Sequence, residues 1–149
     1  MKNMFEKSTY TEISSRLETL SPESKPVWGK MTVAQMMAHA SAALEIATGQ
    51  KTIKQSLLGK IIGPFAKAGY VSEKPFSKGS PTANEFIIKD ERNFSAEKER
   101  LAKLITAFHE GGHEKCTTHP HGFFGFLTTD EWSKTQYKHL DHHFRQFGA

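Results

Sequence analysis

Apolar residues recur at helical spacing along most of the chain. The clearest stripe falls at i, i+3, i+4 and i+7, and its members are Leu101, Leu104, Ile105 and Phe108. Such a stripe is one buried face of an α-helix, and it predicts a helix from Ser95 to the glycine pair at 111–112. A looser pattern predicts a first helix over residues 5–20, ended by Ser21 and Pro22.

Capping-box motifs predict the start of two more helices. Thr32 precedes Gln35 by three residues, and Thr128 precedes Glu131 in the same way. In this motif the hydroxyl accepts a hydrogen bond from the third backbone N–H, and the third side chain bonds back. The predicted helices are Val33 to Thr48, which Gly49 ends, and Thr128 to Gly148.

Four helices of about 15 to 20 residues with almost no strand signal predict an all-α fold, a four-helix bundle. We expect one extra short helix and a long loop between the second and third bundle helices. The extra segment carries a break at Gly63-Pro64, the loop covers residues 72–82, and the short apolar piece at 86–88 reads as coil or strand. A length of 149 residues fits a single domain, residues 1–149.

Composition narrows the class of protein. Hydrophobic residues make up 37% and charged residues 24%, which is typical of a globular chain and excludes disordered and collagen-like classes. The longest uncharged stretch, Met31 to Leu44, is shorter than a membrane span, and the first residues lack the apolar region of a secretory signal. With a single cysteine, Cys116, no internal disulfide forms. We therefore expect a cytoplasmic protein.

The net charge of +4 is concentrated in one segment. Residues 46–72 contain four lysines and no acidic residue, so the rest of the chain sums to zero. The lysines alternate with large apolar residues, a pattern typical of a helix lying on a bilayer or a phosphate backbone, but equally of a helix that covers one end of a core. We favour the second interpretation and expect neither a membrane nor a nucleic-acid partner. The lysines are Lys51, Lys54, Lys60 and Lys67, and the apolar residues are Leu57, Leu58, Ile61, Ile62 and Phe65.

Three of the eight histidines are predicted to face the core. The inward stripe of the last helix contains Trp132, Gln136 and His143, with His139 on its flank. Histidines four apart on one helix face can converge on one ion. His39 shares the inward side of the second helix, so two facing helices supply three nitrogen ligands.

These three imidazoles predict a divalent metal site, His39, His139 and His143. Neutral imidazole favours Zn or Ni, with Fe or Mn as alternatives. The competing interpretation is that each ring is a core histidine bonded to a carbonyl or carboxylate. His142, three residues after His139, rivals His143, but it lies nearer the edge of the stripe and is assigned to the surroundings of the site.

A second cluster precedes the last helix. His113, Cys116, His119 and His121 lie close together in sequence, but one cysteine without a partner pair is a weak zinc motif. We interpret this stretch as a loop and keep His121 as a candidate pocket residue at the open end of the bundle.

Two motifs carry a resemblance that spans nearly the whole chain. WGKMTVAQMMAH (28–39) and HLDHHFRQ (139–146) resemble the signature helices of DinB-like proteins, and HGFFGFL (121–127) resembles a branch without an assigned function. The resemblance implies a four-helix bundle with one divalent metal, held by His39, His139 and His143 and followed by Gln146. It also implies thiol-dependent S-transferase or isomerase chemistry with a low-molecular-weight thiol, and a homodimer.

Together these observations predict a metal-dependent enzyme that conjugates a thiol to an electrophilic small-molecule substrate. The sequence shows no general base facing the site, which favours thiol transfer over metal-assisted hydrolysis. The alternative from another class is a bundle that binds a metal or small ligand without turnover. The candidate pocket residues are Gln136, His142, Gln146, His121 and Trp132.

Overall fold

The computed structural model describes residues 1–149, which fold into five α-helices and one short 3₁₀ turn without any β-strand. The only β-type pairing is an isolated bridge between His121 and Gly125. No helix combines the length and the apolar composition that a membrane crossing requires. The elements are α1 (Lys7–Thr19), α2 (Val33–Ala47), α3 (Leu57–Val71), η1 (Asn84–Phe86), α4 (Phe94–Lys115) and α5 (Thr129–Gln146).

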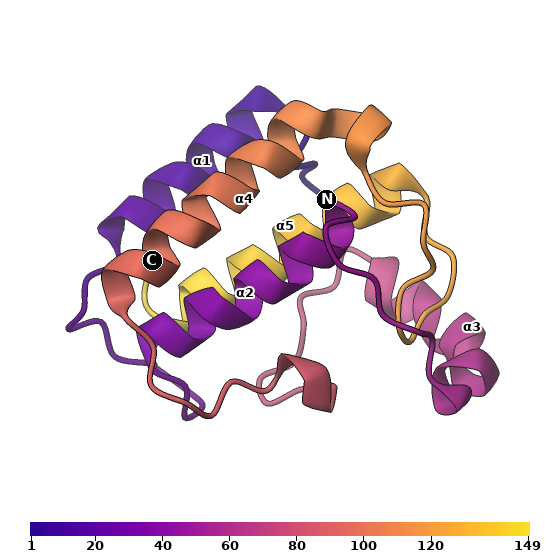
Figure 1. The fold of residues 1–149 in the computed structure, drawn as a ribbon, viewed down its shortest axis with the longest axis horizontal. Helices are drawn as coiled ribbons and strands as arrows, with labels where there is room; N and C mark the ends of the chain where they lie inside the picture. The colour runs from indigo at the N-terminus through magenta and orange to yellow at the C-terminus, as the bar shows by residue number, and fades with distance from the viewer.

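Four of the helices form a closed ring of neighbours (Figure 1). Helix α2 packs against α4 and α5, and α1 packs against the same two helices. Their inner faces share one hydrophobic core, so the all-α bundle prediction is confirmed. The largest side chains buried in that core include Trp132, Phe108, Phe144, Met36 and Leu140.

The predicted helix signals act as expected. Both capping boxes are formed. The Thr32 side chain accepts a hydrogen bond from the backbone N–H of Gln35, and the Thr128 side chain accepts one from that of Glu131. Gly49 follows α2 with a φ of +73°, a left-handed conformation that residues with a Cβ rarely adopt. In α4 the glycine pair interrupts the helix rather than ending it, because Gly112 takes a non-helical conformation and one further turn runs to Lys115.

One local prediction is wrong. Helix α3 continues through Pro64 instead of breaking there. Proline removes the hydrogen bond to the carbonyl of Lys60, but Lys60 lies exposed, so water can replace the missing donor. The apolar piece at 86–88 is coil at Ile87 and Ile88, as one of the two interpretations expected, and Phe86 ends the 3₁₀ turn η1.

Helix α3 does not cover the core as expected. It projects from the ring of four helices, and its large apolar residues face outward (Figure 1). Its inner side instead carries Gly59 and Gly63, which lie against the backbone of Phe123. A Cβ on Gly63 would come within 2.2 Å of the Phe123 carbonyl oxygen, so only glycine allows this close approach.

A buried lysine attaches the end of α3 to the bundle. Lys138 of α5 donates hydrogen bonds to the carbonyls of Tyr70 (2.7 Å) and Ser72 (2.9 Å), and its ammonium lies over the ring of Phe76. The carbonyls at a helix C-terminus carry partial negative charge, which a lysine complements. Lys138, which holds α3 in place, therefore directly precedes His139 of the predicted metal site.

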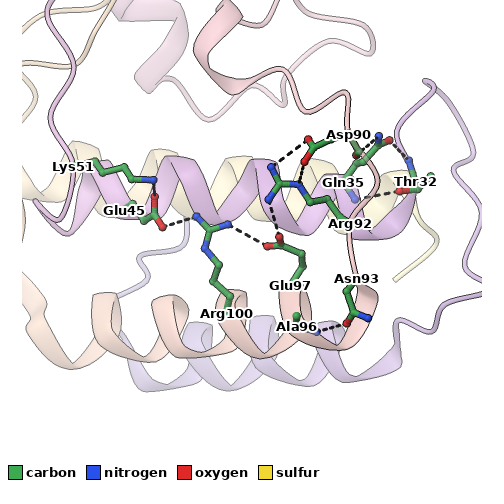
Figure 2. A network of polar contacts seen from close by, with 10 residues as sticks. All are labelled: Thr32, Gln35, Glu45, Lys51, Asp90, Arg92, Asn93, Ala96, Glu97 and Arg100. Atoms are coloured by element: carbon green, nitrogen blue, oxygen red, sulfur yellow. Dashed lines mark hydrogen bonds and ion pairs between the residues drawn. The ribbon is translucent and has the colours of Figure 1, made fainter.

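A chain of ion pairs joins α2 to α4 on the outside of the ring (Figure 2). Arg100 of α4 donates to Glu45 of α2 (2.5 Å) and to Glu97 (3.1 Å). Burial raises the pKa of Glu45, but Arg100 and Lys51 outweigh that effect and hold the pKa below its ordinary value. The carboxylate is therefore charged and depends on its cationic partners.

We predict that Arg100→Met lowers the free energy of unfolding by about 1–2 kcal/mol, because Glu45 and Glu97 each lose one of their charge-assisted partners. The matched control is Lys103→Met, which removes an exposed pair with Glu99 on the same helix and should cost less than about 0.5 kcal/mol. Urea denaturation at pH 7 measures both. Equal losses for the two variants would show that the network contributes no more than surface pairs do.

Candidate metal centre

Three imidazole rings from two helices meet at the interface of α2 and α5. The Nε2 atom of His139 lies 2.9 Å from Nε2 of His39 and 3.1 Å from Nε2 of His143. These residues form the one group of histidine, cysteine and acidic side chains in the protein that could hold a metal ion. The trio expected from the sequence is thus brought together in space.

The helices explain why the rings converge. His39 is buried with Met36 and Ala40 on the face of α2 that meets α5. His139 and His143 are separated by one turn of α5, so their rings lie on the same face, 4.7 Å apart and edge to face. His39 and His143 are buried, whereas His139 is the least buried residue of the three.

The outer nitrogens of two rings are fixed by hydrogen bonds. Nδ1 of His39 lies 2.9 Å from the carbonyl oxygen of Phe86, and Nδ1 of His143 lies 2.8 Å from Oε1 of Gln146. The Gln146 amide is itself oriented, because its Nε2 donates to the carbonyl of Trp28 at 2.7 Å. Gly29 makes room for that amide, since a Cβ there would lie 2.6 Å from Gln146 Nε2.

These bonds determine which nitrogens carry protons. A carbonyl oxygen only accepts, so Nδ1 of both His39 and His143 must donate, and each Nε2 is left as a lone-pair acceptor. Both lone pairs point at His139 Nε2, which can carry a single proton and satisfy one of them. At least one buried lone pair therefore has no donor, a deficit that a cation bound by all three nitrogens removes. The residues present fit a divalent metal.

The surroundings keep these rings neutral. Burial lowers the pKa of His39, and its bond to Phe86 offsets only part of that effect. Burial together with the neighbouring rings lowers the pKa of His143 to about 3 and holds the pKa of His139 well below its ordinary value. Metal ligation requires neutral imidazole, so at neutral pH the cluster is in the ligating state.

A layer of aromatic residues lies beside the cluster. The His121 ring is 5.5 Å from Trp132 and 4.9 Å from Phe124, and Tyr70 stacks on Phe124 at 4.0 Å. Nδ1 of His121 accepts hydrogen bonds from the backbone of the two residues after Gly122, so its proton is on Nε2. His121 is therefore placed as a hydrogen-bond donor rather than as a base.

Two buried polar atoms on α5 have no protein partner. They are Nε1 of Trp132, a donor, and Oε1 of Gln136, an acceptor. The residues are one turn apart, and Gln136 precedes His139 by three positions, so both follow the face that carries the histidine pair. Leaving such groups buried without partners is costly, so each calls for an explanation such as a bound water or ligand.

The remaining sequence candidates occupy other roles. His142 faces Trp28 and Phe76 beside the trio rather than joining it. The second cluster does not assemble, since His113 bonds Thr129 while Cys116 is buried in the core. Sequence reasoning missed the Phe86 carbonyl, because a main-chain acceptor supplied by a loop leaves no residue-type signal.

Comparison with known proteins gives one family match. A family model described as "Protein of unknown function (DUF1569)" matches residues 8–149, which is nearly the whole chain. No curated protein matches this sequence, and no solved structure matches the fold. The chemistry of the site must therefore be argued from its geometry.

We predict that one partly buried histidine outside the trio makes the metal-free protein less stable in acid. Burial lowers the pKa of His121 to about 4 from an ordinary value of 6.5. Between those pH values the unfolded chain binds a proton that the folded chain refuses, so the free energy of unfolding falls as pH decreases, by up to about 1.4 kcal/mol per pH unit.

The variant His121→Asn keeps an acceptor for the two loop N–H groups but cannot titrate. Its unfolding free energy, measured by urea denaturation after metal removal, should fall less steeply than that of the natural sequence from pH 6.5 to pH 4. Parallel curves for the two proteins would mean that His121 accepts its proton equally well in both states.

Proposed function

The chain belongs to the DUF1569 family, and we propose that it is a metal-dependent protein whose His39, His139 and His143 bind one divalent ion. The observation that carries this proposal is the meeting of three Nε2 atoms in which at least one lone pair lacks a donor. Core histidines that served packing alone would each need a separate partner, and here the three rings face one another.

Three neutral imidazoles suit Zn or Ni best, with Fe or Mn as alternatives. We further propose that the fold is DinB-like. The ring formed by α1, α2, α4 and α5, with α3 and a long connection inserted after α2, supports this assignment. One ligand from the second helix and a pair from the last also agree with it. A cytoplasmic location is part of the same proposal.

The reaction we propose is transfer of a low-molecular-weight thiol to an electrophilic small molecule. A bound divalent ion supplies Lewis-acid chemistry that ionises a thiol at neutral pH. The chain's own thiol does not fill this role, because Cys116 is buried and burial raises its pKa to about 11. The thiol must therefore enter as a cosubstrate.

The residues around the trio have separate tasks in this proposal. Trp132 Nε1 and Gln136 Oε1 orient the polar part of the substrate, because each lacks a protein partner. His121 donates from Nε2, and Tyr70 and Phe124 limit the access of water. None of these groups is a free base, so activation of water for hydrolysis lacks a proton acceptor, and this favours thiol transfer.

A second candidate function is metal binding without turnover. The deep burial of His39 and His143, each 6% exposed, favours it, because a metal that only stabilises a fold has a closed coordination sphere. The partial exposure of His139 and the unpartnered Gln136 favour the catalytic proposal instead.

We predict that His143→Ala binds metal at least about tenfold more weakly than the natural sequence, because a ligand is lost. The adjacent variant His142→Ala serves as the matched control and should retain nearly all of the metal. Elemental analysis of protein purified without a histidine tag, followed by Zn titration, measures both. If the two variants lost metal equally, the ligand pair on α5 would not be His139 and His143.

A separate prediction concerns the reaction. Gln136→Leu should keep its metal and its stability, because a buried acceptor without a partner is removed. Turnover of an electrophile with a small thiol, screened on the Zn-loaded and Ni-loaded protein, should fall about tenfold or more through the lost substrate contact. Unchanged turnover would exclude Gln136 from substrate binding, and no turnover by the natural protein with any thiol would favour the non-catalytic candidate.

A further inference from the structure

Helix α3 presents a ridge of large apolar side chains to solvent. Leu57, Ile61 and Phe65, which repeat every four residues, are 79%, 70% and 86% exposed. Leu58 and Ile62 flank them and are also exposed, and Phe126 adds a further apolar side chain next to Lys67. Folded proteins rarely leave such a contiguous apolar surface open unless it binds something.

The ridge cannot be hidden by turning α3 inward. The opposite side of the helix holds Gly59 and Gly63 against the backbone of Phe123, and Lys138 fixes its C-terminal end. Ser56 donates from its backbone to the carbonyl of Gly122 at the N-terminal end. Both ends and the inner side are thus attached where α3 projects from the bundle (Figure 1), so the exposed apolar ridge is a fixed feature.

The charge beside the ridge has one sign. Lys54 and Lys60 are exposed and form no ion pair, whereas Lys51 and Lys67 are paired with Glu45 and Glu131. Residues 46–72 contain no acidic side chain. The ridge is therefore bordered by unpaired positive charge, and it complements a surface that is apolar and anionic.

This positive charge distinguishes between two partners that could cover the ridge, a second copy of the chain and an anionic bilayer. In a pairing of α3 with α3 of a second copy, both segments carry lysines and no acidic side chain, so no ion pair forms between them and their charges repel. A bilayer with anionic headgroups neutralises the lysines and takes up the apolar residues at once. A homodimer of this protein would then use another face.

We propose that α3 docks the protein on an anionic bilayer surface, with Leu57, Ile61 and Phe65 inserted and Lys54 and Lys60 at the headgroups. The helix lies in the plane of the membrane, because its exposed apolar side chains run along its length from Leu57 to Phe65. The expectation of no membrane partner rested on α3 covering the core, and α3 instead exposes its apolar face. This surface is independent of the three-histidine site.

The test is sedimentation of the full chain with vesicles of phosphatidylcholine alone or mixed equally with phosphatidylglycerol. We expect binding to the mixed vesicles that weakens as salt rises. The variant Ile61→Ser/Phe65→Ser should bind about tenfold or more weakly, because two inserted side chains are lost. The control Val27→Ser changes a residue that is 70% exposed outside α3 and should bind normally.

Light scattering of the same proteins separates the second copy from the bilayer. A monomeric natural protein that binds mixed vesicles through Ile61 and Phe65 supports the proposal. Absence of binding to mixed vesicles, equal binding to both kinds of vesicle, or a dimer that the double variant converts to a monomer would each overturn it.

Discussion

The candidate metal centre depends on one electrostatic constraint. Three imidazole Nε2 atoms face one another between α2 and α5. His39 and His143 must each donate from Nδ1, so their Nε2 lone pairs both face His139 at 2.9 and 3.1 Å. One proton on His139 cannot satisfy both. The arrangement is unfavourable for bare neutral rings and more favourable around a cation, so the chemistry of the cluster suits a divalent ion.

Much of the chain maintains this constraint from outside the trio. The Phe86 carbonyl is delivered by the turn η1, and the Gln146 amide is held by the Trp28 carbonyl across a glycine that permits the contact. Ordered outer partners of this kind fix the tautomer and the direction of metal-binding histidines. The long connection between α2 and α4 thus contributes an acceptor to the site, in addition to linking two helices.

The sequence predicted the parts that periodicity and capping determine. Both capping boxes, the helices they begin and the convergence of His39 with His139 and His143 follow from residue types at fixed spacing. The sequence could not predict the position of α3. An amphipathic pattern indicates that a helix has an apolar face, but it does not indicate what covers that face. Helix α3 also continues through Pro64. The hydrogen bond that Pro64 cannot donate to the Lys60 carbonyl is tolerated because Lys60 is exposed to water.

The catalytic and the binding candidates would couple stability to the same bound ion, so they share one physical basis. An ion that binds only the folded chain stabilises it by an amount that grows with ion concentration relative to the dissociation constant. The core beside the trio contains Trp132 and Leu140, so ion binding also secures the packing of α2 on α5. What separates an enzyme from a metal-stabilised scaffold is therefore access on the His139 side, together with a use for the unpaired polar atoms of Trp132 and Gln136.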